Sequence, residues 1–356
     1  MADKFMKSIT FVEGGDAYYP LPKVTNADDG KVLKVVDGKW SVMDPIPTTY
    51  LSFIGTKDFV LTTTNEIKNW DGTLEYSTDT ITWRTWNGTR ISSVGGKLYL
   101  RGIGNTKITG DLENANLYNF YFIVDSYGPI IACEGNIENL LDYETVIAGG
   151  HPTMADYCFA GLFYACMPLA KAPDLPATTL ATGCYANMFG ACMFLETAPA
   201  LPATTLADNC YQGMFGSCQS LATAPALPAT TLSNFCYAYM FNDCPSLTTI
   251  PALPATTLAG ACYYGMFSSC PSLTTIPALP ATTLVDYCYS EMFKDCENIK
   301  LSNTQTGEYQ TPYRMPTSGT GTAATDALTD MFTNTGGTFT ATPSINTTYY
   351  TSNTVV

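Results

Sequence analysis

Residues 210–232 read Cys-Tyr-Gln-Gly-Met-Phe-Gly-Ser-Cys-Gln-Ser-Leu-Ala-Thr-Ala-Pro-Ala-Leu-Pro-Ala-Thr-Thr-Leu, and the chain repeats this stretch with a step of 26 residues. Two series of cysteines, eight residues apart in each copy, account for twelve of the thirteen cysteines. They are Cys158, Cys184, Cys210, Cys236, Cys262 and Cys288, followed by Cys166, Cys192, Cys218, Cys244, Cys270 and Cys296. A fixed period over six copies indicates a tandem-repeat architecture.

Each copy has two parts with different apolar spacing. Between the two cysteines, apolar residues stand at i, i+1, i+4, i+5 and i+8, which predicts a short helix with one buried face. Residues 221–227 alternate and are bounded by prolines, which predicts a brief strand because proline cannot donate to a ladder. A strand and a helix in one 26-residue copy fit the range of leucine-rich repeats. The predicted fold class is therefore α/β, with a leucine-rich-repeat-like solenoid over 136–356 whose stacked copies bury one another's apolar faces.

The C-terminal tail is predicted to cap this array. Residues 326–335 copy the pattern of the predicted helix, with Ala327 and Thr335 in place of the two cysteines. Residues 339–345 then copy the strand with one extra residue, and an insertion within 301–324 separates this cap from the sixth copy.

The pattern Cys-Tyr-x-x-Met-Phe-x-x-Cys-x-x-Leu resembles the BspA-type leucine-rich repeats of bacterial surface proteins. The resemblance covers residues 150–300 closely and 136–356 loosely. Members of this family mostly mediate adhesion, and their repeat motifs are not catalytic. The resemblance thus implies a binding array and leaves its ligand open.

Residues 1–45 form a segment of different composition. Asp29-Gly30 and Asp37-Gly38 flank an apolar run and predict a hairpin. The stretch is similar to a module near the N-terminus of bacteriophage fibre and other virion proteins, which implies an anchor segment. The alternative is an ordinary hairpin in a small β domain. The anchor candidates are Gly30, Val32, Leu33, Gly38 and Trp40.

Residues 46–135 are rich in short strand patterns separated by turn signals, which predicts a small β-sandwich-like domain. The candidate strands are 59–64, 74–79, 82–86, 97–102 and 120–124.

Composition excludes several classes of function. The net charge is −14 with no basic cluster, so phosphate backbones repel the chain and nucleic-acid binding is not expected. No apolar run reaches the ~20 residues of a membrane helix. The first ten residues lack the apolar core of a signal peptide, so we expect synthesis in a host cytoplasm.

The residues that could carry catalysis or bind metals favour structural roles. Cysteines eight apart do not match zinc motifs, and we expect buried free thiols rather than disulfides. The single histidine, His151, lies in a Gly-Gly-His-Pro loop without a clustered partner. The acids of the array are scattered as on a solvated face: Asp156, Asp208, Asp243, Asp286, Glu291 and Asp295. We therefore expect no enzyme and no cofactor, with glycan cleavage by paired carboxylates as an unfavoured alternative.

Aromatic residues are the main candidates for ligand contact. A tyrosine follows the first cysteine in five copies, where it could stack on sugars but is expected to pack between copies. Residues that vary between copies are better placed to face a ligand: Gln212, Ala238, Tyr239 and Tyr264.

Together these features favour a bacteriophage virion surface protein, a head or tail fibre. The N-terminus would bind other virion proteins of the capsid or tail, and the repeats would adhere to a host surface or glycan. A homo-oligomer is expected, with a trimer as the form typical of fibres. The alternative is a bacterial cell-surface adhesin with the same repeats.

Overall fold

The computed structural model describes residues 32–36, 39–43, 50–109, 121–125, 130–316 and 326–356, and the chain divides into two compact units, 1–48 and 49–356. In the first unit β1 (Val32–Val36) pairs antiparallel with β2 (Lys39–Met43). The predicted hairpin is confirmed. Among the anchor candidates, Val32 and Leu33 lie in β1 and Trp40 lies in β2, whereas Gly30 and Gly38 lie outside the described residues.

The second unit begins with two β-sheets. A six-stranded sheet has the order β11-β10-β3-β8-β5-β6, and a three-stranded sheet has the order β7-β4-β9. Their bounds are β3 (Leu51–Gly55), β4 (Val60–Thr63), β5 (Thr73–Ser77), β6 (Arg84–Trp86), β7 (Ile91–Ser92), β8 (Lys97–Ile103), β9 (Phe122–Val124), β10 (Ile131–Glu134) and β11 (Leu169–Lys171). All five predicted strands are confirmed, with ends shifted by up to two residues. A 3₁₀ turn, η2 (Thr64–Glu66), and one α-helix, α1 (Asn139–Ile147), complete this part.

The core of these sheets continues into the repeats without a break. The ring of Phe122 in β9 packs edge-on against Trp86, at 5.4 Å between centroids, and against Phe163 of the first copy, at 6.0 Å. Strand β10 also pairs in parallel with β11, which belongs to the first copy. The sheets therefore cover the apolar end that the first copy would otherwise expose.

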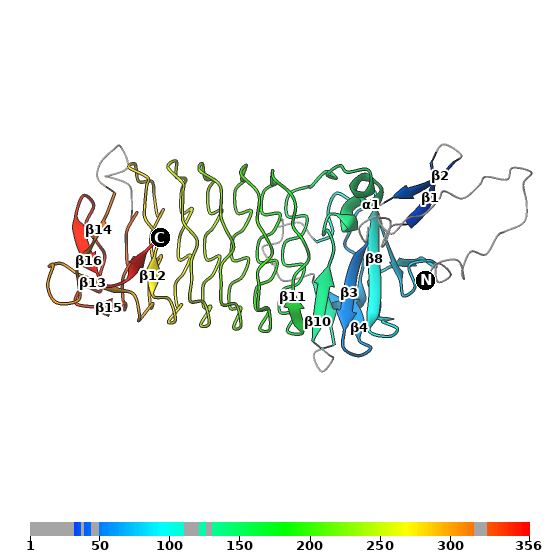
Figure 1. Ribbon diagram of the computed structural model, residues 1–356, viewed down its shortest axis with the longest axis horizontal. Helices are drawn as coiled ribbons and strands as arrows, with labels where there is room; N and C mark the ends of the chain where they lie inside the picture. The colour runs from blue at the N-terminus through cyan, green and yellow to red at the C-terminus, as the bar shows by residue number, and fades with distance from the viewer. Residues whose placement is uncertain (1–31, 37–38, 44–49, 110–120, 126–129, 317–325) are drawn as a thin grey trace, which may run out of the picture. The chain divides into compact units, whose positions relative to one another are not determined.

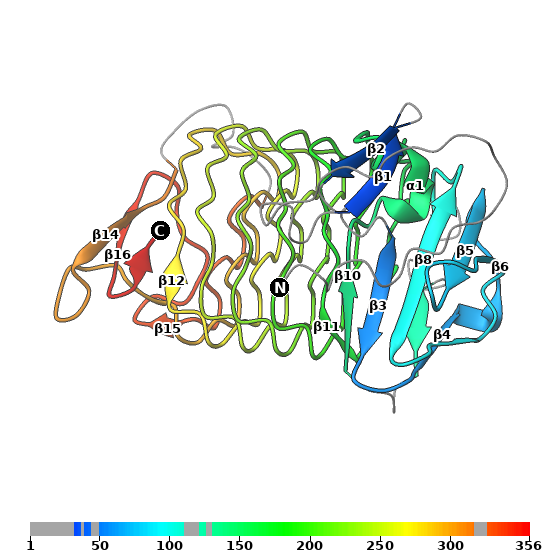
Figure 2. The ribbon, with the colours of Figure 1, turned by 45° about the vertical axis from the view of Figure 1, so that its right-hand side comes forward.

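From residue 157 onward the 26-residue copies form coils that lie side by side (Figures 1 and 2). The segment between the two cysteines is a run of turns, so the predicted helix is wrong. Every second N–H bonds within its coil, as Met214 N does to Tyr211 O at 3.2 Å. The N–H groups between them donate to the next coil, as Phe215 N does to Met240 O at 2.9 Å. The segment thus satisfies its backbone partly within the coil and partly through its neighbour.

The turns depend on a left-handed residue at every fourth position. In each coil the residues one before, three after and seven after the first cysteine have φ between 51° and 64°. In the second coil these are Gly183, Asn187 and Ala191. A four-residue repeat of turns places apolar residues at the same i, i+4 and i+8 spacing as a helix, which is why the sequence pattern fits both. The left-handed positions rule out a continuous α-helix.

The predicted strand is present as a short strand in three copies and is reduced to isolated parallel bridges in the others. Thr223 pairs with Thr249 on one side of the coil and Thr231 pairs with Thr257 on another, but no strand spans 221–227. The prolines that bound this segment cannot donate to a neighbour, so a longer ladder does not form. Among the described residues, short strands occupy this position only in the first copy (β11), the fifth (β12, Thr275–Ile276) and the sixth (β13, Lys300–Ser302). The described chain is consequently built mainly of β-strands and turns, with few helices.

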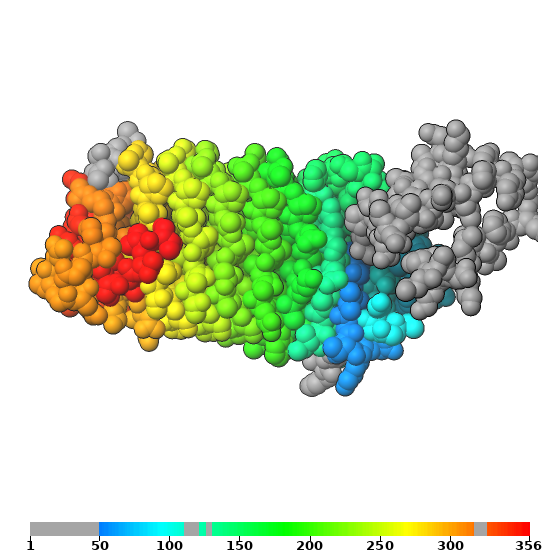
Figure 3. Space-filling model, viewed as in Figure 1, coloured from blue at the N-terminus to red at the C-terminus, as the bar shows by residue number. Residues whose placement is uncertain are grey.

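Side chains inside the coils stack in columns with the same period. Phenylalanine rings from Phe163 to Phe332 and the aromatic rings from Phe159 to Tyr289 lie parallel within 15°, with centroids 5.5–5.9 Å apart. This spacing is typical of offset stacking. The tyrosine column is buried, so the expectation that it packs between copies is confirmed. The columns hold the coils in register and fill the stack, which Figure 3 shows as closely packed bands.

The cysteines occupy two further buried columns as free thiols. In the second column each sulfhydryl from Cys192 onward donates to a phenylalanine carbonyl of the preceding coil, as Cys218 Sγ does to Phe189 O at 3.2 Å. That carbonyl already accepts the N–H of Cys192. Cysteine fits this position because it is small and apolar and has a weak S–H donor, whereas a larger side chain would push neighbouring coils apart.

The C-terminal end is closed by a seventh coil and a small sheet. Residues 326–334 repeat the three left-handed positions, and Phe293 N donates to Met331 O at 3.0 Å, so the predicted cap is confirmed for this segment. The predicted strand over 339–345 is wrong, and Phe339 instead packs on Tyr349 with centroids 4.4 Å apart. A four-stranded sheet covers the end: β14 (Thr311–Arg314), β16 (Thr348–Thr351), β13 (Lys300–Ser302) and β15 (Gly336–Gly337). Finally, β17 (Thr354–Val355) pairs in parallel with β12.

Two buried tyrosine hydroxyls, one in the tyrosine column and one in β14, differ in whether they have a hydrogen-bond partner. The Tyr237 hydroxyl is buried without a hydrogen-bond partner, whereas the Tyr313 hydroxyl donates to Pro277 O at 3.0 Å. We expect Tyr237→Phe to leave the free energy of unfolding unchanged or to raise it by about 1 kcal/mol, because it removes an unpaired polar atom. Tyr313→Phe should lower it by about 1 kcal/mol. Urea unfolding measures both; a larger loss for Tyr237→Phe than for Tyr313→Phe would contradict the assignment.

The cysteine columns predict a loss of stability at alkaline pH. Burial raises the pKa of Cys166 and Cys218 to about 12 and that of Cys288 to about 11, from a usual 9.0. The unfolded chain therefore loses its thiol protons first, and folding stability should be full below pH 9 and fall as pH rises toward 12. Urea midpoints at pH 8, 9.5 and 10.5 test this. At pH 8 a thiol reagent should label no cysteine of the folded chain and all thirteen after denaturation.

Candidate functional site

One side of the stack carries the variable side chains, and we call it the turn face. It consists of the outward side chains of 157–165, 183–191, 209–217, 235–243, 261–269, 287–295 and 326–334. The buried cysteine, methionine and phenylalanine positions of these segments hardly change from coil to coil. The left-handed positions change freely, for example from Gly213 to Tyr239 in consecutive coils. A constant interior thus supports a surface whose chemistry differs at each coil.

The four sequence candidates fall on the turn face, but not all of them reach its surface. Tyr239 is exposed, and Gln212 and Tyr264 are half-buried. Ala238 is fully buried, so its selection as a ligand-facing residue is wrong. Its position lies two residues after the first cysteine, where short side chains such as Ala186 are covered by the neighbouring coils. Only long side chains at this position extend to solvent.

Three tyrosines come together on the turn face, and we call Tyr239, Tyr264 and Tyr287 the aromatic platform. The rings of Tyr239 and Tyr264 meet at 5.0 Å and 88°, and those of Tyr264 and Tyr287 at 6.4 Å and 79°. They come from the fourth, fifth and sixth coils. Tyr287 remains 42% exposed, a large share for an aromatic ring. Sequence reasoning missed Tyr287 and the exposed Phe235, which directly precede a first cysteine where the second, third and fifth coils have glycine, asparagine and alanine.

A glycine in the next coil makes room for the first ring of the platform. The Tyr239 ring lies over Gly265, where an added Cβ would be 2.6 Å from Tyr239 Cε1. Gly265 also has a φ of 56°, which other residues adopt at a cost. Tyr157 of the first coil and Gly183 of the second coil form the same arrangement. In these two pairs a large ring in one coil is matched by a glycine 26 residues later.

Hydrogen bonds and burial raise the pKa of two of the platform hydroxyls. Burial and a hydrogen bond to Tyr264 raise the pKa of Tyr239 above its usual value. A hydrogen bond to Asp326, and the charge of that carboxylate, raise the pKa of Tyr287. The platform contains no cationic side chain and is bordered by carboxylates such as Asp326. It can offer ring faces and phenol hydroxyls to a ligand, but it would repel an anion.

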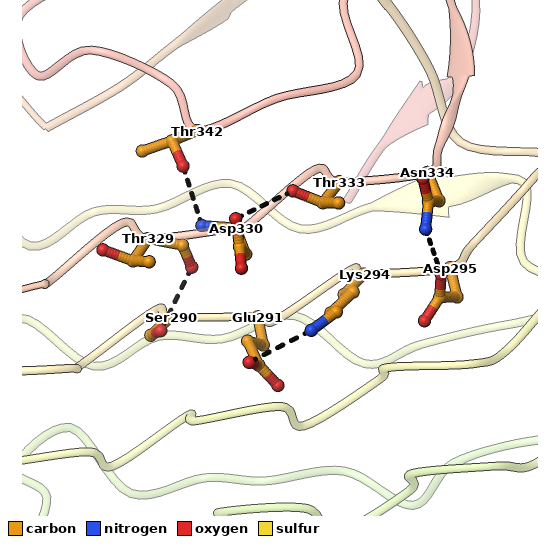
Figure 4. A network of polar contacts seen from close by, with 9 residues as sticks. All are labelled: Ser290, Glu291, Lys294, Asp295, Thr329, Asp330, Thr333, Asn334 and Thr342. Atoms are coloured by element: carbon orange, nitrogen blue, oxygen red, sulfur yellow. Dashed lines mark hydrogen bonds and ion pairs between the residues drawn. The ribbon is translucent and has the colours of Figure 1, made fainter.

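Polar contacts fix the coils beside the platform. Ser290 Oγ donates to Thr329 O at 3.1 Å and Asn334 Nδ2 to Asp295 Oδ1 at 2.8 Å, which joins the sixth and seventh coils (Figure 4). Lys294 is paired with Glu291 at 3.2 Å and is not free to offset the nearby acids. These contacts hold the coil that supplies Asp326 against the coil that supplies Tyr287.

His151 occupies a different part of the second unit and has a structural partner. Its Nδ1 lies 2.8 and 3.1 Å from the two carboxylate oxygens of Glu138, whose side chain is fully buried just before α1. The pair borders a hollow lined by Pro152, Met154, 177–181 and the pair itself, and this lining contains no serine or cysteine. His151 therefore ties its loop to the start of α1.

Two further kinds of site are not found in the residues that the structure describes. They contain no group of three or more histidine, cysteine or acidic residues arranged to hold a metal ion. Nor do they contain a helix with the length and apolar character to cross a membrane.

The histidine pair predicts a coupled stability effect. Replacing His151 by alanine leaves the buried Glu138 carboxylate without its partner, which should lower the free energy of unfolding by about 1–2 kcal/mol. Glu138→Gln removes the charge that needs the partner, so His151→Ala should cost much less in that background. Urea unfolding of the four proteins in this cycle measures the coupling. Equal costs of His151→Ala in both backgrounds would contradict it.

Comparison with known proteins adds no relative to this geometry. Neither protein-family models, curated proteins nor solved structures match the chain. The aromatic platform is accordingly the best candidate site on physical grounds, namely exposed rings held rigidly on a regular scaffold.

Proposed function

We propose that this protein is a virion surface protein of a bacteriophage, a head or tail fibre that adheres to the host through the turn face of its coils. The observation that carries the proposal is the aromatic platform, three rings presented on a stack whose interior stays constant. Exposed aromatic rings cost free energy in water, because each leaves apolar area that could be buried. A rigid surface that keeps them exposed is typical of a binding site.

We assign the coils to a solenoid of the BspA-type leucine-rich-repeat kind, in which a run of turns takes the place of the helix. The 26-residue step, the parallel bridges between coils and the leucines of the bridge side support this assignment. A stack of this kind grows in one direction and offers a long surface for adhesion.

The remaining parts have roles that follow from the sequence. The hairpin of β1 and β2 is the proposed anchor to other capsid or tail proteins, and the sheets of 50–134 are a spacer that also covers the first coil. The protein would act at the virion surface as a homo-oligomer and without catalysis. Adhesion needs no reactive group, and the one histidine is engaged with Glu138.

Substitutions on the aromatic platform test the adhesive role. Tyr239→Ala combined with Tyr287→Ala should weaken binding of the labelled full-length protein to intact host bacteria by at least about tenfold, because both rings lose their contact area. Flow cytometry over a panel of bacterial strains provides the measurement. Phe194→Ala is the matched control, since Phe194 is an exposed ring (49%) outside the platform. Equal loss in the control and the platform variant would contradict the site.

Electron microscopy tests the virion setting separately. Antibodies against the chain should label the head or tail of phage particles from the native source. Labelling of bacterial cell walls without particles would instead support the adhesin alternative. The first outcome together with unaffected cell binding by the platform variant would retain the virion role and refute the site.

A further inference from the structure

The chain has only four arginines, and two of them have structural partners. Arg101 donates from Nε to Glu75 Oε2 at 2.7 Å, and its guanidinium lies 4.1 Å from the centre of the Trp83 ring. Arg314 donates to Thr348 Oγ1 at 3.1 Å and to Asn346. Both therefore stabilise the fold. The other two are Arg84 and Arg90.

Arg84 and Arg90 are exposed and line the same hollow in the sheet region. Arg84 begins β6, the edge strand of the six-stranded sheet, and Arg90 directly precedes β7 of the three-stranded sheet. The structure gives neither guanidinium a hydrogen bond or ion pair within the described chain. The hollow also includes Tyr76, Thr78 and Ser92 among its walls. Two arginines without a partner among the described residues thus line one hollow beside the edge strands β6 and β7.

The backbone on both sides of the hollow is firmly held. In the 77–82 loop, Asp79 Oδ1 accepts the N–H groups of Ile81 and Thr82 at 2.8 and 2.7 Å. On the other side, Trp86 Nε1 donates to Thr89 O at 2.7 Å, next to Arg90. Arg84 itself lies in the β5–β6 ladder, opposite Tyr76. The two arginines are therefore presented by fixed supports, which lowers the entropy lost when they bind.

The charge around the hollow is locally reversed relative to the whole protein. The net charge of the chain is −14, yet the hollow has two guanidinium groups and one carboxylate, Asp79. Backbone hydrogen bonds from Thr82 and Ile81 lower the pKa of Asp79 to about 2, so it stays ionised and serves its own loop. One net positive charge remains, together with the Thr78 and Ser92 hydroxyls. Adjacent like charges without a counterion are unfavourable, so an anion there would relieve their repulsion.

We propose that Arg84 and Arg90 form a binding site for an oxyanion group of an acidic polysaccharide, a carboxylate or a sulfate ester. Each guanidinium offers a planar fork of N–H donors that matches two oxygens of such a group. Hydroxyls beside the arginines suit the hydroxyl-rich ring that carries the anion. A densely charged polymer such as a nucleic acid is disfavoured, because the rest of the chain would repel it. The site is independent of the aromatic platform, which repels anions.

The experiment measures binding of the full-length protein to two probes, polygalacturonate and dextran sulfate, with uncharged dextran as reference. Affinity gel electrophoresis or calorimetry at low and moderate salt is suitable. Arg84→Gln combined with Arg90→Gln should weaken binding at least tenfold. Arg84→Lys combined with Arg90→Lys should recover only part of it, since lysine keeps the charge and loses the fork. Arg314→Gln is the matched control, an exposed arginine elsewhere in the same unit.

Each result decides the proposal. Binding of polygalacturonate alone identifies a carboxylate site, and binding of dextran sulfate alone identifies a sulfate site. Wild-type binding retained by the double glutamine variant, or no binding of either charged probe, would overturn the proposal. Circular dichroism and the unfolding midpoint confirm that the variants are folded. Tyr239→Ala should leave polyanion binding unchanged, so this test and the adhesion test can fail separately.

Discussion

The alternation of hydrogen bonds in the turn segment is the constraint on which the rest of the structure depends. One N–H closes a turn, and the next reaches the neighbouring coil, so no coil can satisfy its backbone alone. This fixes the spacing of the coils, and the spacing in turn places the rings and thiols in columns. It also requires a left-handed residue at every fourth position, which costs backbone energy that the contacts between coils must offset. Stability is consequently a property of neighbouring pairs of coils.

Much of this architecture could be predicted from the sequence, because the repeat imposes itself on residue types. The period, the buried cysteines and the seventh coil all follow from the recurrence of a few positions. The run of turns was not predicted, because the apolar spacing of four-residue turns resembles that of a helix and therefore indicated a helix. The distinguishing signal was present in pairs such as Gly183 and Asn187, or Asn209 and Gly213, which favour left-handed backbone and stand four residues apart. A real helix would place such residues near its ends.

The candidate sites were less predictable, because they depend on distances between coils and between sheets. Tyr239 and Tyr264 could be selected as variable positions, but their contact with Tyr287 arises only when three coils are stacked. Ala238 varies in the same way and is buried, because side-chain length decides what reaches the surface at its position. Arg84 lies in β6 of one sheet, and Arg90 directly precedes β7 of another. That both line one hollow, and that neither has a partner among the described residues, appears only in the folded chain.

The hydrogen bonds between coils also determine how the array responds to force. They point from one coil to the next, so tension between the two ends of the stack acts along them and opens them one coil at a time, as in unzipping. Each coil that separates would release 26 residues, at most about 86–94 Å of extended chain. Such a stack would lengthen in discrete steps and dissipate energy at each step. In the proposed fibre, such stepwise lengthening would hold an attached particle in flowing liquid by a tether that extends gradually.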